Sequence, residues 1–276
     1  MRLLAASLGL VLLAGCTTPA PAPSGSPSPS GAASASASAG GSALLAVYYT
    51  LTDRGTPKLV REFHRLAVAA DTPAGKTTAA VAEMLRPSAL DPDYKTLWPS
   101  GVRVTGSSVE GDVVTVDLTG LTSGVGAEAE GQAIQQLVWT ATANSGASRV
   151  RVRVDGAAVE SVFGHVSVRE PVSRAPAIDT LHLVWVIGPQ EGETVGRDVT
   201  LHLAGIVFEN TLNYEILQNG KVVRHEVVTL EPGHPAMGEK KVTVRLSPGA
   251  YVVQAYEISM ADSSRQHVDN HAFTVR

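Results

Sequence analysis

The stretch QLVWTATANSGASRVRVRVDG, residues 136–156, decides the fold of the first half of this chain. Together with the residues just before it, the stretch places apolar side chains at the i, i+3, i+4, i+7 spacing of one helical face: Ile134, Leu137, Val138 and Ala141. This spacing predicts a helix over residues 128–143, which Asn144-Ser145-Gly146 ends. Residues 149–155 then alternate arginine with valine, which predicts a half-buried strand. A helix running directly into such a strand indicates mixed α and β structure.

Patterns upstream of this stretch complete an α+β domain. Apolar runs typical of strands cover residues 43–51, 63–68, 102–107 and 112–118. Thr72 followed by Pro73 has the form of a helix N-cap with proline at the first helical position, and Pro87 ends the apolar periodicity of that helix. We therefore predict two helices packed on one face of a mostly antiparallel sheet.

The second half of the chain shows strand patterns without helical periodicity. Seven candidate strands cover residues 181–187, 199–203, 211–218, 221–230, 241–246, 250–259 and 267–275. Asn219-Gly220 between two of them is a strong hairpin signal. Short strands with regular turns predict an all-β, immunoglobulin-like sandwich. Because this half has no cysteine pair, we expect Trp185 and Phe208 to fill its core.

Both halves resemble known families. GDVVTVDL, residues 111–118, and the QLVWT…VRVRVDG unit are similar to the GerMN domain, the sporulation and germination module of GerM-type envelope proteins. WVIGPQEGETVGRDVTLHLAGIVFENTLNYEILQNGKVV, residues 185–223, and GAYVVQAYEIS, residues 249–259, are similar to Gmad2, the immunoglobulin-like module often found behind GerMN domains. The resemblance implies an extracytoplasmic interaction module of a sporulation or germination type, and it supplies no catalytic residues to carry over.

The N-terminal segment has the features of an exported, lipid-modified protein. Its apolar run, residues 3–13, is shorter than the roughly 20 residues that a membrane-spanning helix needs, so it has the form of a signal peptide. The residues that follow, Leu13-Ala14-Gly15-Cys16, resemble the lipobox of bacterial lipoproteins, which implies a diacylglyceryl group on the Cys16 thiol and cleavage before it. Cys16 is the only cysteine in the chain, and an ordinary secretory signal with an incidental cysteine is the alternative.

These patterns divide the chain into four parts. Residues 1–16 are the predicted lipoprotein signal peptide and lipobox, and residues 17–42 are a disordered linker of proline, serine and alanine. Residues 43–170 form the GerMN-like α+β domain, and residues 177–276 form the Gmad2-like sandwich. With lipid on Cys16, we expect the protein to be anchored to the cell membrane on its extracytoplasmic face.

Charge and motif content argue against several other functions. The net charge of −4 provides no basic field for nucleic acid. Asp91-Pro92-Asp93 lacks the further ligands of a calcium loop and predicts a turn, while Ala74–Thr77 lacks the first glycine of a phosphate-binding loop. No Gly-x-Ser-x-Gly is present. We expect no catalytic residue, metal or cofactor, and therefore no enzyme.

The histidines also lack the spacing of a metal site. His267 and His271 would lie about 13 Å apart on one strand, whereas His182 and His202 fall on separate strands without a carboxylate tied to them by sequence. Ordinary, satisfied histidines are the preferred interpretation. Glu128 and Glu130 fall in the first turn of a predicted helix, where they complement its dipole.

Two surface features remain open in the sequence. Tyr48 and Tyr49 are consecutive in a strand, so one of them is expected to point outward. Arg149, Arg151 and Arg153 line one face of another strand. A solvated charged face is the preferred interpretation of the arginines, and a docking face for an acidic partner or wall polymer is the alternative.

Two functional hypotheses follow. The first is a lipid-anchored scaffold that binds envelope proteins without catalysing a reaction, and the second is a lipoprotein that binds wall glycan or a small molecule in a groove. Sparse tryptophan and tyrosine disfavour glycan stacking. An exported hydrolase ranks last.

Overall fold

The structure is a computed structural model that describes residues 39–121, 125–232 and 236–276. Cys16, the predicted signal peptide and nearly all of the predicted linker lie outside the described residues. Within the described part of the chain, no helix combines the length and the apolar character needed to cross a membrane.

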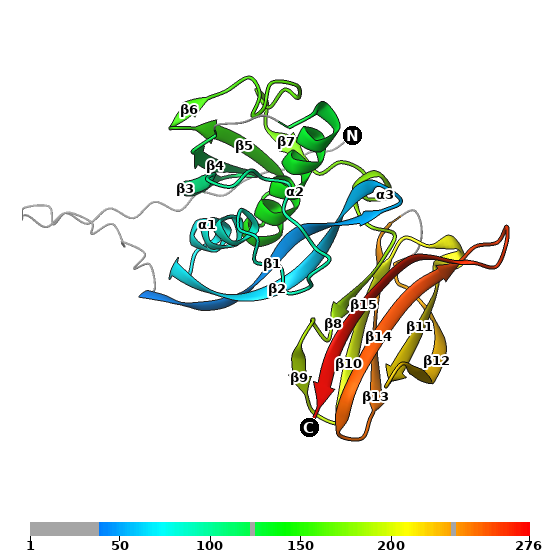
Figure 1. Ribbon diagram of the computed structural model, residues 1–276. Helices are drawn as coiled ribbons and strands as arrows, with labels where there is room; N and C mark the ends of the chain where they lie inside the picture. The colour runs from blue at the N-terminus through cyan, green and yellow to red at the C-terminus, as the bar shows by residue number, and fades with distance from the viewer. Residues whose placement is uncertain (1–38, 122–124, 233–235) are drawn as a thin grey trace, which may run out of the picture. The chain divides into compact units, whose positions relative to one another are not determined.

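The first half begins with a long antiparallel hairpin of β1 (Ala39–Asp53) and β2 (Thr56–Ala70), shown in blue and cyan in Figure 1. The strands are joined by a two-residue turn in which Arg54 and Gly55 have φ values of 49° and 86°. Positive φ at both central residues is the requirement of a type I′ turn, whose twist matches that of the strands. Asp53, paired with Thr56, therefore stands at the tip of the hairpin.

Helices α1 (Pro73–Met84) and α2 (Ala127–Ser145) pack against this hairpin. As predicted, the Thr72 hydroxyl accepts the backbone N–H of Gly75 at the start of α1, and Pro73 occupies the first turn, where its missing N–H costs nothing. Helix α2 ends at Gly146, which has a φ of 74° and serves as a left-handed C-cap.

A second, mixed sheet lies on the other side of the helices (Figure 1). It is built from β3 (Arg103–Glu110), β4 (Val113–Thr119), β5 (Arg149–Val154), β6 (Ala157–Ala158) and β7 (Val172–Ser173). Strands β4 and β5 are parallel and are connected through α2, whereas the other pairs are antiparallel. The predicted α+β class is confirmed. Its strands form two separate sheets, and the helices lie between them and contact both.

A row of polar side chains on α2 explains why β1 and β2 do not join the second sheet. Gln136, Thr140 and Asn144 recur at four-residue intervals, and their side chains hydrogen-bond the backbone of β1. Thr140 accepts from the N–H of Tyr48, and the amides of Gln136 and Asn144 donate to the carbonyl oxygens of Tyr48 and Ala46. Polar side chains thus satisfy part of the β1 edge that pairs with none of the described strands.

The expectation that one of Tyr48 and Tyr49 points outward is wrong, because both are buried. The Tyr48 ring packs against Trp139 of α2, with the ring centroids 5.5 Å apart. Tyr49 points to the opposite face of β1, where its hydroxyl contacts Ser88 in the segment that follows α1. The hairpin is therefore covered on both faces.

The second half is a β-sandwich preceded by a short helix, α3 (Ala177–Thr180), which the sequence did not predict. One sheet has the order β13-β10-β8 and the other has the order β12-β11-β14-β15-β9. The strands are β8 (Val184–Gly188), β9 (Glu193–Val195), β10 (Asp198–Gly205), β11 (Thr211–Gln218), β12 (Lys221–Thr229), β13 (Gly238–Arg245), β14 (Gly249–Ile258) and β15 (Arg265–Val275). The predicted all-β immunoglobulin-like sandwich is confirmed, with β9 added in parallel to β15.

The two aromatic residues expected in the sandwich core differ. Trp185 is fully buried, but it packs in the core cluster that holds Leu59 and Val60 of β2, whereas its neighbours Val184 and Val186 face the sandwich core, so its predicted place is wrong. Phe208 is 61% exposed, so neither aromatic residue fills the sandwich core. Phe208 opens a short 3-10 turn (Phe208–Asn210) outside the strands, and strand residues such as Leu203 and Tyr214 fill the core instead.

Candidate functional site

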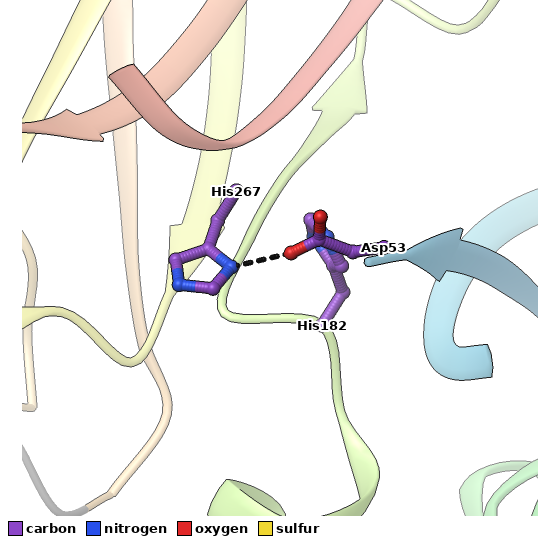
Figure 2. Close-up of side chains that lie close together, drawn as sticks. All are labelled: Asp53, His182 and His267. Atoms are coloured by element: carbon purple, nitrogen blue, oxygen red, sulfur yellow. Dashed lines mark hydrogen bonds and ion pairs between the residues drawn. The ribbon is translucent and has the colours of Figure 1, made fainter. Parts of the chain in front are cut away.

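Three polar side chains from distant segments meet at the tip of the β1–β2 hairpin (Figure 2). We call Asp53, His182 and His267 the Asp53 cluster; one ligand atom from each lies within 4.8 Å of the others. The Asp53 Oδ2 atom is 2.7 Å from Nδ1 of His267 and 3.8 Å from Nε2 of His182. The two imidazole rings meet edge to face, with centroids 5.9 Å apart.

Local structure positions both histidines of the cluster. His182 follows α3, and its backbone N–H donates to the Leu59 carbonyl of β2, which fixes the segment beside the hairpin. His267 lies where the register of β14 and β15 shifts, and its φ is 52°. A bulge of this kind redirects a side chain out of the normal alternation of a strand. Burial lowers the pKa of His182, so its imidazole is neutral at ordinary pH.

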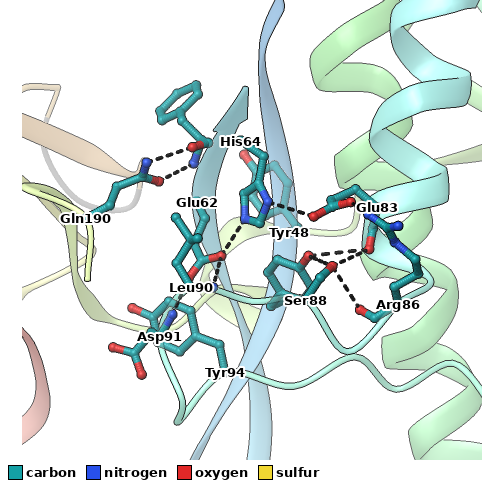
Figure 3. Close-up of polar contacts among 12 residues, drawn as sticks. Tyr48, Glu62, His64, Glu83, Arg86, Ser88, Leu90, Asp91, Tyr94 and Gln190 are labelled. Carbon is teal, nitrogen blue, oxygen red and sulfur yellow. Dashed lines mark hydrogen bonds and ion pairs between the residues drawn. The ribbon is translucent and has the colours of Figure 1, made fainter. Parts of the chain in front are cut away.

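A second group of ionisable residues is buried beneath α1 (Figure 3). In this group, which we call the His64 network, the imidazole of His64 lies between two carboxylates. Its Nε2 is 2.7 Å from Glu62 Oε2, and its Nδ1 is 3.0 Å from Glu83 Oε1. Glu62 and His64 are two residues apart on β2 and so share one face, while Glu83 comes from α1. Arg86 also pairs with Glu83.

The two carboxylates hold His64 in its charged form. Burial by itself would lower the pKa of His64, but hydrogen bonds and Coulomb attraction from Glu62 and Glu83 outweigh this and raise it. Burial likewise opposes ionisation of Glu83, yet hydrogen bonds from Arg86 and Ser88 lower its pKa. The network therefore places a histidine whose charged form is favoured between two carboxylates, one of which also pairs with Arg86.

Glu62 also fixes the segment after α1. Its carboxylate accepts the backbone N–H groups of Leu90 and Asp91, at 3.0 and 2.9 Å (Figure 3). The Asp93 N–H in turn donates to the Asp91 carboxylate, so Asp91-Pro92-Asp93 forms the turn that the sequence predicts. Because Glu62 accepts from three donors, it has little capacity left for a ligand.

Strand β2 also contacts the sandwich residues through specific polar pairs. The Gln190 amide accepts from the N–H of Phe63 and donates to its carbonyl, at 2.5 and 2.7 Å, as a neighbouring strand would. Arg61 forms an ion pair with Glu239, which also accepts from His202. These partners pull the pKa of Glu239 down to about 2, the His202 hydrogen bond being the largest cause.

A third cluster joins Asp91 and Tyr94 to Asp269 and His271, and all four residues are buried. Tyr94 and the Val186 N–H both donate to Asp269, at 2.9 and 2.7 Å. Nδ1 of His271 donates to the carbonyl of Pro189. Burial raises the pKa of Asp269 to about 6. Hydrogen bonds within this cluster satisfy most of its polar atoms.

A groove of about 770 Å³ runs beside the His64 network. Residues of β2, of the segment after α1 and of the sandwich line it, and they include Phe63, Leu66, Leu90, Ile187, His202 and Lys241. Its lining is a mixture of apolar and charged side chains.

The structure redistributes the histidines that the sequence singled out. His182 lies beside His267 and not beside His202, which pairs with Glu239. His267 and His271 belong to separate clusters, as their strand spacing implies. No sequence signal links Asp53 to His182 or His267, because the three residues come together only through tertiary packing.

Glu130 has a larger role than its predicted interaction with the helix dipole. It is fully buried, and its carboxylate accepts the N–H groups of Phe163 and His165 at 2.9 and 2.8 Å. Among the arginines of β5, Arg149 pairs with Asp112 and Arg153 is exposed. The alternation itself is confirmed, since Val150 and Val152 are buried.

Two family models match the chain in the order that the sequence implied. Germane, described as sporulation and spore germination, matches residues 46–160. Gmad2, described as the immunoglobulin-like domain of bacterial spore germination, matches residues 183–264. Together the two matches cover more than half of the chain. The chain therefore belongs to the class of proteins in which a sporulation and spore germination domain precedes a germination-type immunoglobulin-like domain.

Solved structures with partial similarity include GerMN domains. The tandem GerMN domains of the sporulation protein GerM from Bacillus subtilis are 21% identical with a TM-score of 0.38, and the match covers 52% of this chain and 49% of that one. The first GerMN domain of that protein is 14% identical with a TM-score of 0.36, covering 48% and 98%. Fibronectin(III)-like modules of Clostridium thermocellum CbhA are 18% identical with a TM-score of 0.23, covering 34% and 94%. No curated protein is similar enough to count as a relative.

Proposed function

We propose that this protein is a lipid-anchored module on the extracytoplasmic face of the cell membrane that binds other envelope proteins and catalyses no reaction. The observation that carries this proposal is the presence of two germination-type domains in sequence. The anchor is Cys16, which the lipobox-like Leu13-Ala14-Gly15-Cys16 indicates. Residues 17–38 act as the tether, since β1 already begins at Ala39 and not at the predicted residue 43. Residues 39–170 and 177–276 act as the two binding modules.

The buried ionisable groups support a structural role over catalysis. His64 has both ring nitrogens engaged by carboxylates, so it has no free nitrogen to accept a substrate proton. The carboxylate oxygens of Glu62 and Glu130 accept hydrogen bonds from backbone N–H groups of neighbouring segments. These three groups stabilise the fold, and none of them is directed toward a substrate.

The exposed edge of the sandwich provides positions at which to look for a partner. Strand β12 pairs only with β11 among the described strands, and Val222, Val223 and Val227 are each about half exposed (49%, 52% and 54%). A long edge strand with exposed apolar side chains is a surface to which an extended segment of another chain can add. Val223 and Val227 are therefore suitable sites for a photo-crosslinking amino acid.

The experiment is in-cell crosslinking of the full-length protein, followed by affinity capture and mass spectrometry. A Cys16→Ala form serves as the comparison, and a crosslinker at the exposed Arg153 of β5 serves as the positional control. The proposal expects the same one or two envelope proteins to be recovered repeatedly from the anchored form and lost in Cys16→Ala. Equal recovery from both forms contradicts anchoring through Cys16.

The groove beside the His64 network favours a second candidate function, the binding of a wall fragment or a small molecule. It combines the apolar residues Phe63, Leu66 and Ile187 with His202 and Lys241. Recovery of wall fragments without any protein partner in the same capture experiment would replace the scaffold function with this one.

A further inference from the structure

We propose that the Asp53 cluster binds one divalent transition-metal ion of the zinc class, and that this ion fastens the tip of the β1–β2 hairpin to His182 and to β15. Two imidazoles and one carboxylate form a ligand set that such ions use in proteins, with further positions left for water. The three ligand atoms already lie within 4.8 Å of one another. The site is separate from the envelope-binding function proposed above and does not depend on it.

The hydrogen bonding of His182 favours a cation as the ligand of the cluster. Its Nδ1 faces the carbonyl oxygen of Val184, and because a carbonyl only accepts, Nδ1 carries the proton. Nε2 then presents a lone pair. His182 is 1% exposed and its Nε2 has no hydrogen-bond partner among the described residues.

That lone pair lies 3.8 Å from the Asp53 carboxylate, beyond hydrogen-bonding distance. A buried lone pair facing a carboxylate is repulsive, and a cation bound to both atoms removes the repulsion. A histidine that donates one ring N–H to a backbone carbonyl while the other nitrogen faces a ligand position is the usual arrangement around a bound metal.

The backbone at His267 is consistent with a positioned ligand. Two residues of β15, His267 and Val268, face the single Tyr256 of β14, because Ala255 pairs with Asp269 and Glu257 pairs with Gln266. His267 also has a φ of 52°, a conformation that a non-glycine residue adopts at a cost. The bulge and the positive φ together direct Nδ1 of His267 to within 2.7 Å of Asp53 Oδ2 (Figure 2).

The two contacts of Asp53 require small movements, and the two imidazole nitrogens, which lie within 4.8 Å of each other, must also approach. Metal–ligand bonds of about 2.0–2.2 Å in a tetrahedron place ligand atoms roughly 3.3 Å apart. The contact of Asp53 with His267 must open and its contact with His182 must close, each by about half an ångström on this geometry. When the ion binds, Nδ1 of His267 gives up the proton that it donates to Asp53, and His267 becomes a neutral ligand with its proton on Nε2.

Access and charge also bear on the site. The side chains of Asp53 and His267 are 25% and 17% exposed, so an ion can enter from their side. Lys58 opposes a cation, but its ammonium is engaged by the carbonyl oxygen of Asp179. The buried cluster of Asp91, Asp269 and His271 is the competing candidate, and its internal hydrogen bonds make it the weaker one.

The test uses the full chain in detergent, without an affinity tag of histidines and with Cys16→Ser so that no thiol competes for metal. Zn²⁺ is titrated in competition with a chromogenic chelator, and bound metal is counted after dialysis. We expect one ion per chain, and His182→Gln and His267→Gln should each weaken binding by at least about 10-fold. His225→Gln is the matched control, because this exposed histidine of β12 is not one of the ligand groups of the Asp53 cluster.

Replacing Zn²⁺ with Co²⁺ provides a second readout, since a four-coordinate site gives strong visible absorption bands that His267→Gln should abolish. If His182→Gln does not fold, Asp53→Asn at the hairpin tip provides the same comparison. Binding that is equal in wild type and in the Asp53 and His267 variants overturns the proposal. Loss of binding in His271→Gln but not in His267→Gln also overturns it, because the metal then belongs to the other cluster.

Discussion

Arg61 on β2 and Glu239 on β13 form an ion pair of 2.7 Å across 178 positions of sequence, and His202 donates to the second oxygen of the same carboxylate. The carboxylate of Glu239 is therefore held between two donors from two strands. Its pKa falls from 4.5 to about 2, mainly through the His202 hydrogen bond and then through Arg61.

This arrangement predicts a defined loss of stability in acid. Because the folded pKa is below the unfolded one, the contribution of Glu239 is complete above pH 4.5 and disappears as the pH falls toward about 2. Urea denaturation between pH 6 and pH 2 should show a steeper decline for wild type than for Glu239→Gln. Parallel curves for the two proteins would contradict this role for Glu239.

The His64 network predicts a large cost for removing its cation. His64→Leu removes the cation that Glu62 and Glu83 share in the buried network, which should destabilise the protein by about 3–5 kcal/mol. Arg65→Gln, at the exposed neighbouring position, is the control and should change stability by less than about 0.5 kcal/mol. Urea denaturation at pH 6 provides the comparison.

The raised pKa of His64 also gives this stabilisation a pH dependence of the opposite sign. It is complete below the unfolded value of 6.5 and is lost as the pH rises through the raised folded value. The difference between wild type and His64→Leu should therefore shrink at alkaline pH. A difference that grows with pH would show that His64 is neutral in the folded protein.

The polar face of α2 predicts that an apolar substitution can destabilise a buried helix. Gln136→Leu leaves the carbonyl of Tyr48 and the N–H of Leu97 without their partner. We expect a cost of about 1–3 kcal/mol for each group left unsatisfied. Glu128→Gln, an exposed change on the same helix, serves as the control, and hydrogen exchange at Leu97 should accelerate only in Gln136→Leu.

The exposed position of Phe208 predicts tolerance to substitution. Phe208→Ser should change stability by less than about 0.5 kcal/mol, whereas Leu203→Ala in the buried core should cost about 2–5 kcal/mol. Thermal unfolding of both variants distinguishes the two positions. A large loss in Phe208→Ser would mean that this ring packs against the protein in solution.

Local patterns were sufficient to predict most strands, both main helices and the N-cap at Thr72, because hydrophobic periodicity and capping depend on residues a few positions apart. They did not predict the second sheet. The reason is that Gln136, Thr140 and Asn144 form a polar row, which is typical of a solvent-facing helix until a strand edge is placed beside it. Phe208 was misassigned because its size indicates burial while its position after β10 places it in a turn.

The ionisable clusters could not be predicted from local sequence patterns either, because their members lie far apart in the sequence. Glu83 lies 19 positions from His64, and Asp53 lies 214 positions from His267. Pairs at such separations form only when the strands and helices have packed, so no local spacing reports them. The one partial signal was Glu62-x-His64, two ionisable residues facing the same side of an apolar strand.

The register of the hairpin has a mechanical consequence for a chain held at its N-terminal end. Tension would enter at Ala39, which pairs with Ala70, while the Asp53–Thr56 pair lies at the far end. A load applied in this way peels an antiparallel ladder one pair at a time, whereas a load along the strands would have to shear many pairs together. The pairs of the hairpin would therefore separate one after another from Ala39, and the pairs next to Asp53 would separate last.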